Sequence, residues 1–266
     1  MQALMIPKDP NDEKDVFIEI RAGAGGGEAS IFAADLARMY MRYAEAQKMK
    51  VETVSISESD AGGYKEIVFA VKDGAPYKLF KHESGVHRVQ RVPVTEAQGR
   101  VHTSTATVAV LPLIEDDNSE VEVNAKDLQI DTYKASGAGG QYVNKTESAI
   151  RITHVPTGIV VACSEERSQL QNRARAMQML RSVLYDRKRR EAEEAVGSMR
   201  RSQVGTGDRS EKIRTYNYPQ DRITDHRVNQ SFGNLRGVLD GNLGHLVAAL
   251  LKDERERMLA GEAAST

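Results

Sequence analysis

The sequence predicts an α+β protein in which a sandwich-like α/β core is joined by a connector to a small domain of one β-sheet and one long helix. Of its 266 residues, 40% are hydrophobic, which is enough for more than one folded core. Apolar runs of strand length alternate with segments whose apolar residues recur every three or four positions. A polar acidic stretch at residues 115–120 separates two such groups.

The first group, residues 15–114, has an α/β pattern. Val16–Ile20 is a predicted strand that ends in a glycine-rich loop, and the helix expected after this loop has one apolar face. The residues of that face are Phe32, Leu36, Met39, Tyr43 and Ala46. A short helix is expected after Pro76, which suits a first helical turn. Further strands are predicted at 51–57, 64–72 and 105–113.

The second group, residues 115–196, predicts a small sheet backed by one helix. The last two of its strands are joined by Val155–Gly158, whose proline and glycine favour a tight turn. The strands are expected at 128–133, 149–154 and 159–163, and the helix at 165–196, with an apolar stripe of Leu170, Ala174, Met177, Leu180 and Leu184.

The remaining segments flank these two groups. Residues 1–14 are predicted to be a polar N-terminal segment, and 197–214, with mixed charges and three glycines, a flexible connector. Residues 215–266 have helical patterns near 235–239 and 243–251, and we expect them to pack on the first group.

Composition excludes several function classes. The single cysteine, Cys163, cannot form an internal disulfide, and the six histidines have no metal-ligand spacing, so no metal site or cofactor is predicted. No apolar run is long enough to span a membrane, and no signal-peptide pattern is present. Between Tyr133 and Tyr216 there are 16 Lys or Arg against 9 Asp or Glu, although the whole chain has a net charge of −1. This basic third is compatible with RNA contact or with a solvated helix.

A loop of the second group, Ser136–Gln141, contains the sequence Gly-Ala-Gly-Gly-Gln. Glycines let the backbone adopt positive φ and approach another surface closely, so the next backbone N–H can stabilise developing charge at a reacting atom. A flexible hairpin loop is the alternative. Nearby basic residues that could hold an RNA backbone are Lys134, Lys145, Arg151 and Arg173.

The other glycine-rich loop, Gly23–Gly27, lies between a predicted strand and a helix, but it does not have the pattern of a nucleotide site. It lacks the Lys-Ser/Thr ending of a P-loop, and Glu28 at the helix start would repel a phosphate. The segment His87–Ser104 is rich in Arg, Gln, Thr and His, side chains that can bond to or stack on unpaired bases. An ordinary polar loop is the alternative for this segment.

These motifs together resemble bacterial class-I peptide chain release factors, specifically those of the release factor 1 type. The resemblance extends over nearly the whole chain, through IPKDPNDEKDVFIEIRAGAGGGEA, HRVQRVPVTEAQGRVHTS, SGAGGQYVNKTESAIRITHVPTGIVV and GTGDRSEKIRTYNYPQDRITDHRVN in that order. It implies a codon-recognition domain at 15–114, a catalytic domain at 115–196 and a switch loop at 197–214 that couples the two.

The resemblance also implies the functional residues. Pro93, Val94 and Thr95 match the tripeptide that reads UAA and UAG stop codons, with Thr95 on the first two bases. His102 would stack between the second and third bases, Gln90 and Thr103 would contact the third, and Gly25 and Glu28 the first. Gly139, Gly140 and Gln141 match the loop that promotes hydrolysis of peptidyl-tRNA, where the backbone N–H of Gln141 would stabilise the transition state.

The implied partners are the decoding-centre and peptidyl transferase-centre RNA of the ribosome, the mRNA stop codon and peptidyl-tRNA, in the cytoplasm, with no membrane. Because ribosomal RNA supplies much of the active site, hydrolysis would be promoted only together with the ribosome. A methyltransferase would modify Gln141 to N5-methylglutamine.

Two features depart from the family pattern. Tyr142 stands where many relatives have His, which favours the backbone mechanism. The family's N-terminal helical domain has no counterpart here, so we expect a weakened interaction with the recycling GTPase. Two alternatives stay open, a ribosome-binding module without release activity and a codon-independent rescue hydrolase. The codon-reading segment and the non-basic tail argue against the second.

Overall fold

The computed structural model describes residues 9–113, 121–134 and 147–265, which fall into two compact units. One unit contains residues 1–115 and 196–266, and the other contains residues 116–195. These divisions lie within one residue of those expected from the sequence. The fold is α+β, as predicted, and each unit has its own β-sheet.

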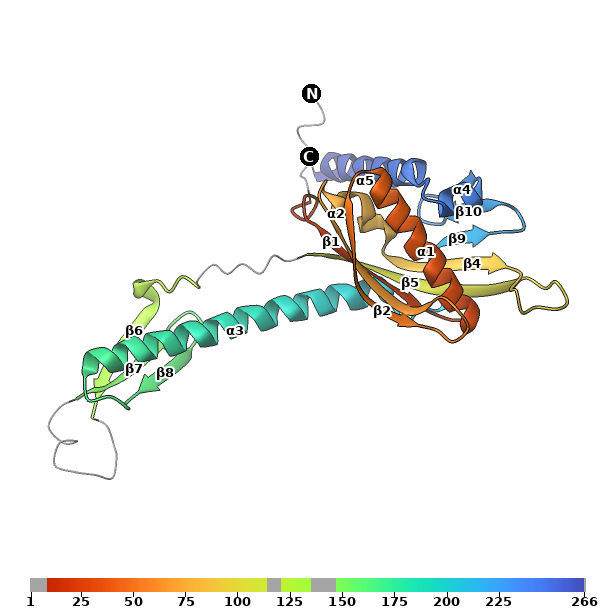
Figure 1. Cartoon of the computed structure of the whole chain (residues 1–266). Helices are drawn as coiled ribbons and strands as arrows, with labels where there is room; N and C mark the ends of the chain where they lie inside the picture. Colours follow the sequence, from red (N-terminus) through yellow and green to blue (C-terminus); the bar gives the residue numbers. More distant parts are fainter. Residues whose placement is uncertain (1–8, 114–120, 135–146, 266) are drawn as a thin grey trace. The chain divides into compact units, whose positions relative to one another are not determined.

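The first unit is built on an eight-stranded sheet in the order β11-β10-β9-β4-β5-β1-β3-β2 (Figure 1). Neighbouring strands are antiparallel except β4 and β9, which are parallel. The strands are β1 (Val16–Ala22), β2 (Lys50–Glu58), β3 (Tyr64–Lys72), β4 (Gly85–Arg91), β5 (His102–Pro112), β9 (Lys212–Asn217), β10 (Arg222–Asp225) and β11 (Gln230–Gly233).

Helix α1 (Gly27–Ala46) lies across one face of this sheet and closes its main core (Figure 1). Four of the five predicted apolar residues of α1 are buried, and the fifth, Ala46, is exposed in the last turn. The sheet contributes Ile18, Ile20 and Phe69, each with no exposed surface. The other helices of the unit are α2 (Pro76–Phe80), the 3-10 helix η2 (Lys81–Glu83), α4 (Leu235–Leu239) and α5 (Gly244–Ser265).

The second unit has a three-stranded antiparallel sheet packed against α3 (Gln169–Val204). Its strands are β6 (Leu128–Tyr133), β7 (Ala149–His154) and β8 (Ile159–Cys163), with the bounds that the sequence predicts, after the 3-10 helix η3 (Ala125–Asp127). The buried row of α3 is Asn172, Ala176, Leu180 and Leu184, whereas the predicted Leu170 and Ala174 are exposed.

The buried Asn172 explains why the row on α3 begins on a polar residue. Its side-chain NH₂ donates to the carbonyls of Ser148 (2.7 Å) and Glu166 (2.9 Å), and its carbonyl oxygen accepts from the backbone N–H of Glu166 (2.9 Å). The thiol of Cys163 donates to the same oxygen. With its polar atoms bonded, the amide is buried at little cost.

The segment expected as a flexible connector, 197–214, is ordered differently. Helix α3 continues to Val204, the 3-10 helix η4 spans Arg209–Glu211, and β9 begins at Lys212. The helix continues because the segment Ser198–Val204 contains neither proline nor glycine. The sequence predicts no strand at β4, β9, β10 or β11. Arg214 of β9 and Asp225 of β10 are buried charged residues, which resemble surface residues in sequence.

Across the described ranges, no helix is both long and apolar enough to cross a membrane.

Candidate functional site

The eight residues predicted to read a codon belong to the first unit and lie where β1 ends, α1 begins, and β4 passes into β5. Gln90 is in β4, Thr103 and His102 are at the start of β5, and Glu28 is in the first turn of α1. The other predicted site, Gly139–Gln141, lies outside the described residues.

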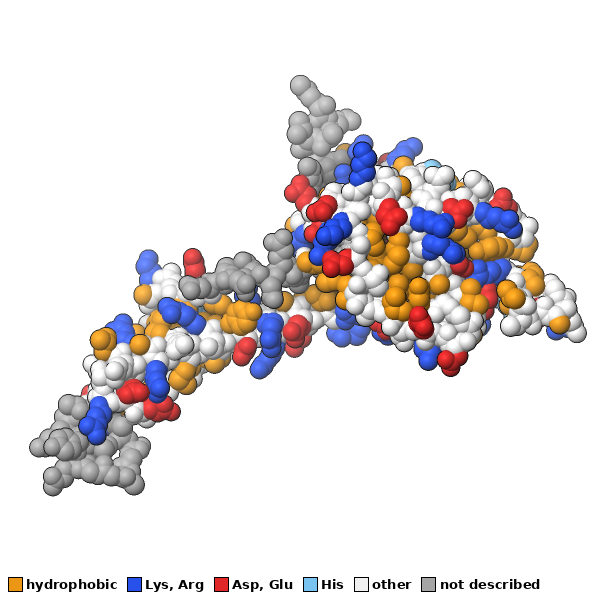
Figure 2. Space-filling model, viewed as in Figure 1, with side chains coloured by type: hydrophobic (Ala, Val, Ile, Leu, Met, Phe, Trp, Pro, Cys, Tyr) orange, Lys and Arg blue, Asp and Glu red, His pale blue; other side chains and the backbone are white. Residues whose placement is uncertain are grey.

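The connection between β4 and β5, residues 92–101, projects from the sheet (Figure 1). It contains a turn in which the backbone N–H of Glu96 donates to the carbonyl of Pro93 (3.1 Å). Pro93 is buried, whereas Val94 is 98% exposed and Thr95 is exposed. Hydrophobic side chains stand on this projection in Figure 2. Pro93 therefore anchors the turn, and the next two residues, Val94 and Thr95, are exposed to solvent.

The carboxylate of Glu96 organises the rest of the connection. One of its oxygens accepts from the backbone N–H of Gln98 (3.0 Å), and the other lies 2.7 Å from Nε2 of His102. The side chain of His102 is half exposed. The half-exposed ring of His102 is thereby held at the base of the projection.

Gln90 and Thr103 are direct cross-strand partners, so their side chains lie on the same face of the sheet. The carbonyl oxygen of the Gln90 side chain accepts from Asn217 Nδ2 (3.1 Å), and its backbone carbonyl accepts from the N–H of Tyr218 (3.0 Å). Gln90 is therefore fixed from β9, on the side opposite to Thr103.

The glycine-rich loop at the start of α1 packs tightly on β5. Gly23 donates to the carbonyl of Thr105 (2.8 Å), and Ala24 accepts from its N–H (2.8 Å). Gly25 has φ of 124°, and a Cβ there would lie 2.4 Å from Oγ of Ser104. Glycine is required at this position for both conformation and space.

The hydroxyl of Thr105 joins this loop to the segment 205–211. It accepts from the backbone N–H of Ala24 (2.8 Å) and donates to the carbonyl of Gly207 (3.0 Å). Two residues further, Arg209 Nε donates to the carbonyl of Thr103 (3.0 Å). The segment predicted as the switch loop thus contacts the strand that carries two predicted codon-reading residues.

Arg91, the last residue of β4, contacts Glu28 in the first turn of α1. Its Nε pairs with the Glu28 carboxylate, and its Nη1 donates to Asp35 (2.6 Å) and to the hydroxyl of Tyr218 (3.1 Å). Burial alone would lower the pKa of Arg91, but the hydrogen bonds to Asp35 and Glu28 outweigh it and raise the pKa. This guanidinium stays charged.

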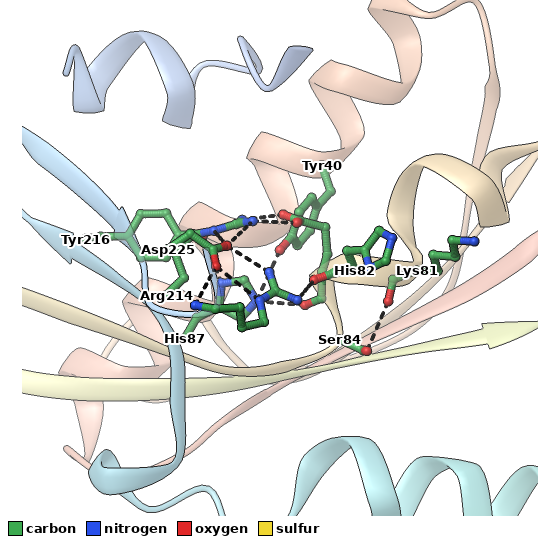
Figure 3. Close-up of polar contacts among 10 residues, drawn as sticks. Tyr40, Lys81, His82, Ser84, His87, Arg214, Tyr216 and Asp225 are labelled. Atoms are coloured by element: carbon green, nitrogen blue, oxygen red, sulfur yellow. Dashed lines mark hydrogen bonds and ion pairs between the residues drawn. The ribbon is translucent and has the colours of Figure 1, made fainter. Parts of the chain in front are cut away.

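The start of β4 is fixed by a buried ionic cluster (Figure 3). Arg214 of β9 donates two hydrogen bonds to the carboxylate of Glu83, and the distance from Nη2 to Oε2 is 2.7 Å. Both side chains are buried. Arg214 also pairs with Asp225 of β10 (3.2 Å), and Asp225 pairs with Arg227 (2.8 Å). Arg214, Glu83 and Asp225 are buried and Arg227 is partly exposed, and the two cations balance the two anions, which makes the burial of these charges tolerable.

His87 of β4 completes this cluster as a neutral imidazole. Its Nε2 lies 2.7 Å from the carbonyl of Glu83, which can only accept, so Nε2 carries the proton and Nδ1 accepts from the hydroxyl of Tyr216 (2.9 Å). Burial and the charge of Arg214 lower the pKa of His87 to about 4. For Glu83, burial is outweighed by Arg214, which holds the pKa of the carboxyl below its ordinary value.

In the second unit, the described residues nearest to the predicted catalytic loop include three exposed basic side chains. They are Lys134, Arg151 and Arg173. The guanidinium of Arg151 lies over the ring of Tyr133, 5.2 Å from its centroid. Arg151 alternates with the buried Ile150 and Ile152 and so faces away from α3, which carries Arg173. Lys145 lies outside the described residues.

Sequence reasoning missed Arg91, Thr105 and Arg214 as parts of the site. Thr105 begins the predicted strand 105–113, and Arg214 ends the predicted connector. The signal that could have indicated Thr105 is its place as a polar residue in the predicted, mainly apolar strand 105–113. No comparable signal marks Arg91 or Arg214, since arginine is usually exposed.

Comparisons with known proteins identify the family of the chain. Residues 1–108 match the PCRF domain family, and residues 116–227 match the RF-1 domain family. The chain is 61% identical over 251 residues to peptide chain release factor 1 of Caldicellulosiruptor saccharolyticus, which covers 94% of this chain and 70% of the relative. It is 58% identical over 259 residues to the Clostridium tetani protein of the same name, with 97% and 72% covered.

Among solved structures, RF2 of Thermus thermophilus matches with a TM-score of 0.58 and 38% identity, over 94% of this chain and 71% of that one. Family, sequence and fold lead to one assignment: the chain belongs to the class-I peptide chain release factors of the release factor 1 type, and its function is translation termination on the ribosome.

Proposed function

We propose that the chain reads UAA and UAG stop codons with the end of the first unit's sheet and promotes hydrolysis of peptidyl-tRNA with the loop Gly139–Gln141. The observation that carries the codon assignment is the exposed turn at Pro93–Glu96. Groups that can read base edges surround it on three elements: Glu28 on α1, Gln90 on β4 and Thr103 on β5.

Each recognition element has one task in this proposal. The hydroxyl of Thr95 bonds to the first two bases, and Gly25 and Glu28 contact the first. The half-exposed ring of His102 stacks between the second and third bases, and Gln90 and Thr103 read the third. Pro93 is buried and fixes the turn, while Val94 extends into solvent. Anchored donors and acceptors discriminate because a wrong base leaves them unpaired.

In the catalytic step, water adds to the ester carbonyl of peptidyl-tRNA and the bond to the ribose oxygen breaks, with a proton passing to that oxygen. The backbone N–H of Gln141 stabilises the charge that develops, and the preceding glycines allow close approach. The side chain of Gln141 excludes other nucleophiles and is the site for a glutamine methyltransferase. Reaction takes place in the cytoplasm, together with ribosomal RNA.

The test is peptide release from ribosomes programmed with UAA, UAG, UGA or a sense codon. We expect release at UAA and UAG only. Release at every codon would support the rescue hydrolase, and tight binding at UAA without release would support the non-releasing module. Either result would overturn this proposal.

A substitution series tests the catalytic loop. Gln141→Ala keeps the backbone N–H and should retain partial release, whereas Gln141→Pro removes it and should reduce the rate by roughly 10²–10³-fold. Gly140→Val should also lose release, because a side chain blocks positive φ. A proline variant that releases peptide at the parent rate would contradict the role of the backbone N–H. Binding to UAA ribosomes is the control for folding.

A further inference from the structure

Arg91 occupies a junction between the elements of the proposed codon-reading site. Its side chain is 13% exposed, and its partners Glu28 and Asp35 are seven residues apart on α1, two turns on one face. The third partner, Tyr218, follows β9. One guanidinium therefore ties the start of α1 and the end of β9 to the end of β4.

The place of this guanidinium is set by its two carboxylate partners. It lies 5.2 Å from the ring centroid of Tyr218 and 6.0 Å from that of Phe32, within the range of cation–π attraction. Among the described residues, Nη2 of Arg91 is buried with no hydrogen-bond partner. An unpaired buried donor is unfavourable, so the guanidinium is placed to form its two ion pairs at the expense of a hydrogen bond from Nη2.

The ion pair restricts Glu28 in particular. Without Arg91, the Glu28 side chain would be free to change rotamer in the first turn of the helix. With Arg91, the carboxylate is only 11% exposed and is fixed relative to β4. Because Arg91 directly precedes the connection that holds Pro93–Thr95, this contact sets the spacing between the α1 tip and the exposed turn.

The reader of the third base has a separate support. Gln90 is held by Asn217, and no contact of Arg91 is made with Gln90's side chain in the described part of the chain. The first-base group Glu28 and the third-base group Gln90 are thus fixed by different neighbours, although Gln90 and Arg91 are adjacent residues of β4. Loss of one support should relax recognition of one base only.

We infer that Arg91 is a positioning residue for first-base recognition, acting through Glu28 and the tip of α1, and this rests on the proposed codon-reading function. Arg91 does not contact the codon. It fixes the carboxylate and the loop that do, so its loss admits other bases at the first position. A shift of about 1 Å in a group that contacts the first base is enough to weaken the discrimination between bases strongly.

The experiment compares release efficiencies, kcat/KM, at UAA with those at CAA and UAC, which differ from it at the first and third bases. Release by the parent at UAA but not at CAA or UAC tests the proposed function separately. Given that, Arg91→Gln should lower the UAA/CAA ratio by about tenfold or more, equivalent to 1.4 kcal/mol, and leave the UAA/UAC ratio within about threefold. Arg91→Lys should restore part of the first ratio.

Two matched controls sharpen the result. Arg88→Gln removes another β4 arginine, bonded to Thr215 rather than to Glu28, and should change neither ratio. Asn217→Ala should lower the UAA/UAC ratio and spare the UAA/CAA ratio. Asp35→Asn weakens the ion pair with Arg91 and keeps both Arg91 and Glu28. It is the substitute variant if Arg91→Gln fails to fold, and it should still lower the UAA/CAA ratio.

A double variant tests whether Arg91 works through Glu28. Arg91→Gln combined with Glu28→Gln should have the same UAA/CAA ratio as Glu28→Gln alone. The inference is overturned if the two effects multiply, or if Arg91→Gln reduces release equally at all three codons. Equal reduction would mean that the ion pair serves stability alone.

Discussion

The two ends of β4 differ sharply. At its start, His87 and the adjoining Glu83 belong to a cluster in which the charges of Glu83, Arg214 and Asp225 are buried and multiply bonded (Figure 3). At its end, the connection at 92–101 carries exposed side chains held mainly by Glu96. Since both belong to one strand, the buried end can fix the frame while the exposed end remains free to meet a ligand. The buried end of β4 therefore holds in place the strand from which the exposed connection at 92–101 extends.

The largest effect is expected from breaking the buried end. Arg214→Met leaves Glu83 and Asp225 without their shared cation, so the free energy of unfolding should fall by about 3–5 kcal/mol, measured by urea denaturation. The control is Arg21→Met, which removes an exposed ion pair with Glu66 (2.9 Å) and should cost less than about 1 kcal/mol. Equal losses in the two variants would contradict the distinction between buried and exposed charges.

A smaller effect should follow from pH. The folded pKa of His87 is about 4, below its ordinary value of 6.5, so as pH falls the unfolded chain takes up a proton first. The contribution of neutral His87 is complete above pH 6.5 and is lost progressively toward pH 4, by roughly 3 kcal/mol in total.

His87→Gln is the variant that isolates this contribution. Its free energy of unfolding should depend less on pH between 6.5 and 4 than that of the parent, in urea titrations at several pH values. Burial and nearby Lys212 also lower the pKa of His226, but this residue is present in both proteins and cancels in the comparison. Parallel profiles for parent and variant would show that His87 does not titrate in this window.

The smallest effect on stability is expected at the exposed end. Thr95→Ala should change the free energy of unfolding by no more than about 0.5 kcal/mol, because the side chain is exposed. The same change should weaken stop-codon recognition by about 1–3 kcal/mol, measured as release at UAA and UAG. Codon-independent release in organic solvent should be unaffected. A parallel loss in that assay would indicate damage to the fold instead of to reading.

The contrast also explains what the sequence could predict. In the second unit, β6, β7 and β8 have the predicted bounds, because apolar runs between clear turn signals determine them. In the first unit, no strand was predicted at β4 or β9, and the predicted connector 197–214 covers the start of β9. Their sequences contain His87, Arg88 and Arg214, and only the parallel pairing of β4 with β9, far apart in sequence, makes partners available for such side chains.

The candidate site divides in the same way. Motif residues such as Thr95 and Gln90 could be named from the resemblance, because a ligand dictates their identity. The supporting residues Arg91 and Asn217 could not, since their importance depends on which strands meet. The roles of Gly139, Gly140 and Gln141 stay predictions, as these residues lie outside the described part of the chain.

The hydroxyl of Thr105 has a consequence of its own. It accepts a hydrogen bond from the N–H of Ala24 and donates one to the carbonyl of Gly207. Each bond polarises the oxygen in the sense that strengthens the other, so the two contacts are cooperative and not independent. A displacement of either backbone segment is therefore felt by the other through a single atom, with no side chain needing to change its rotamer.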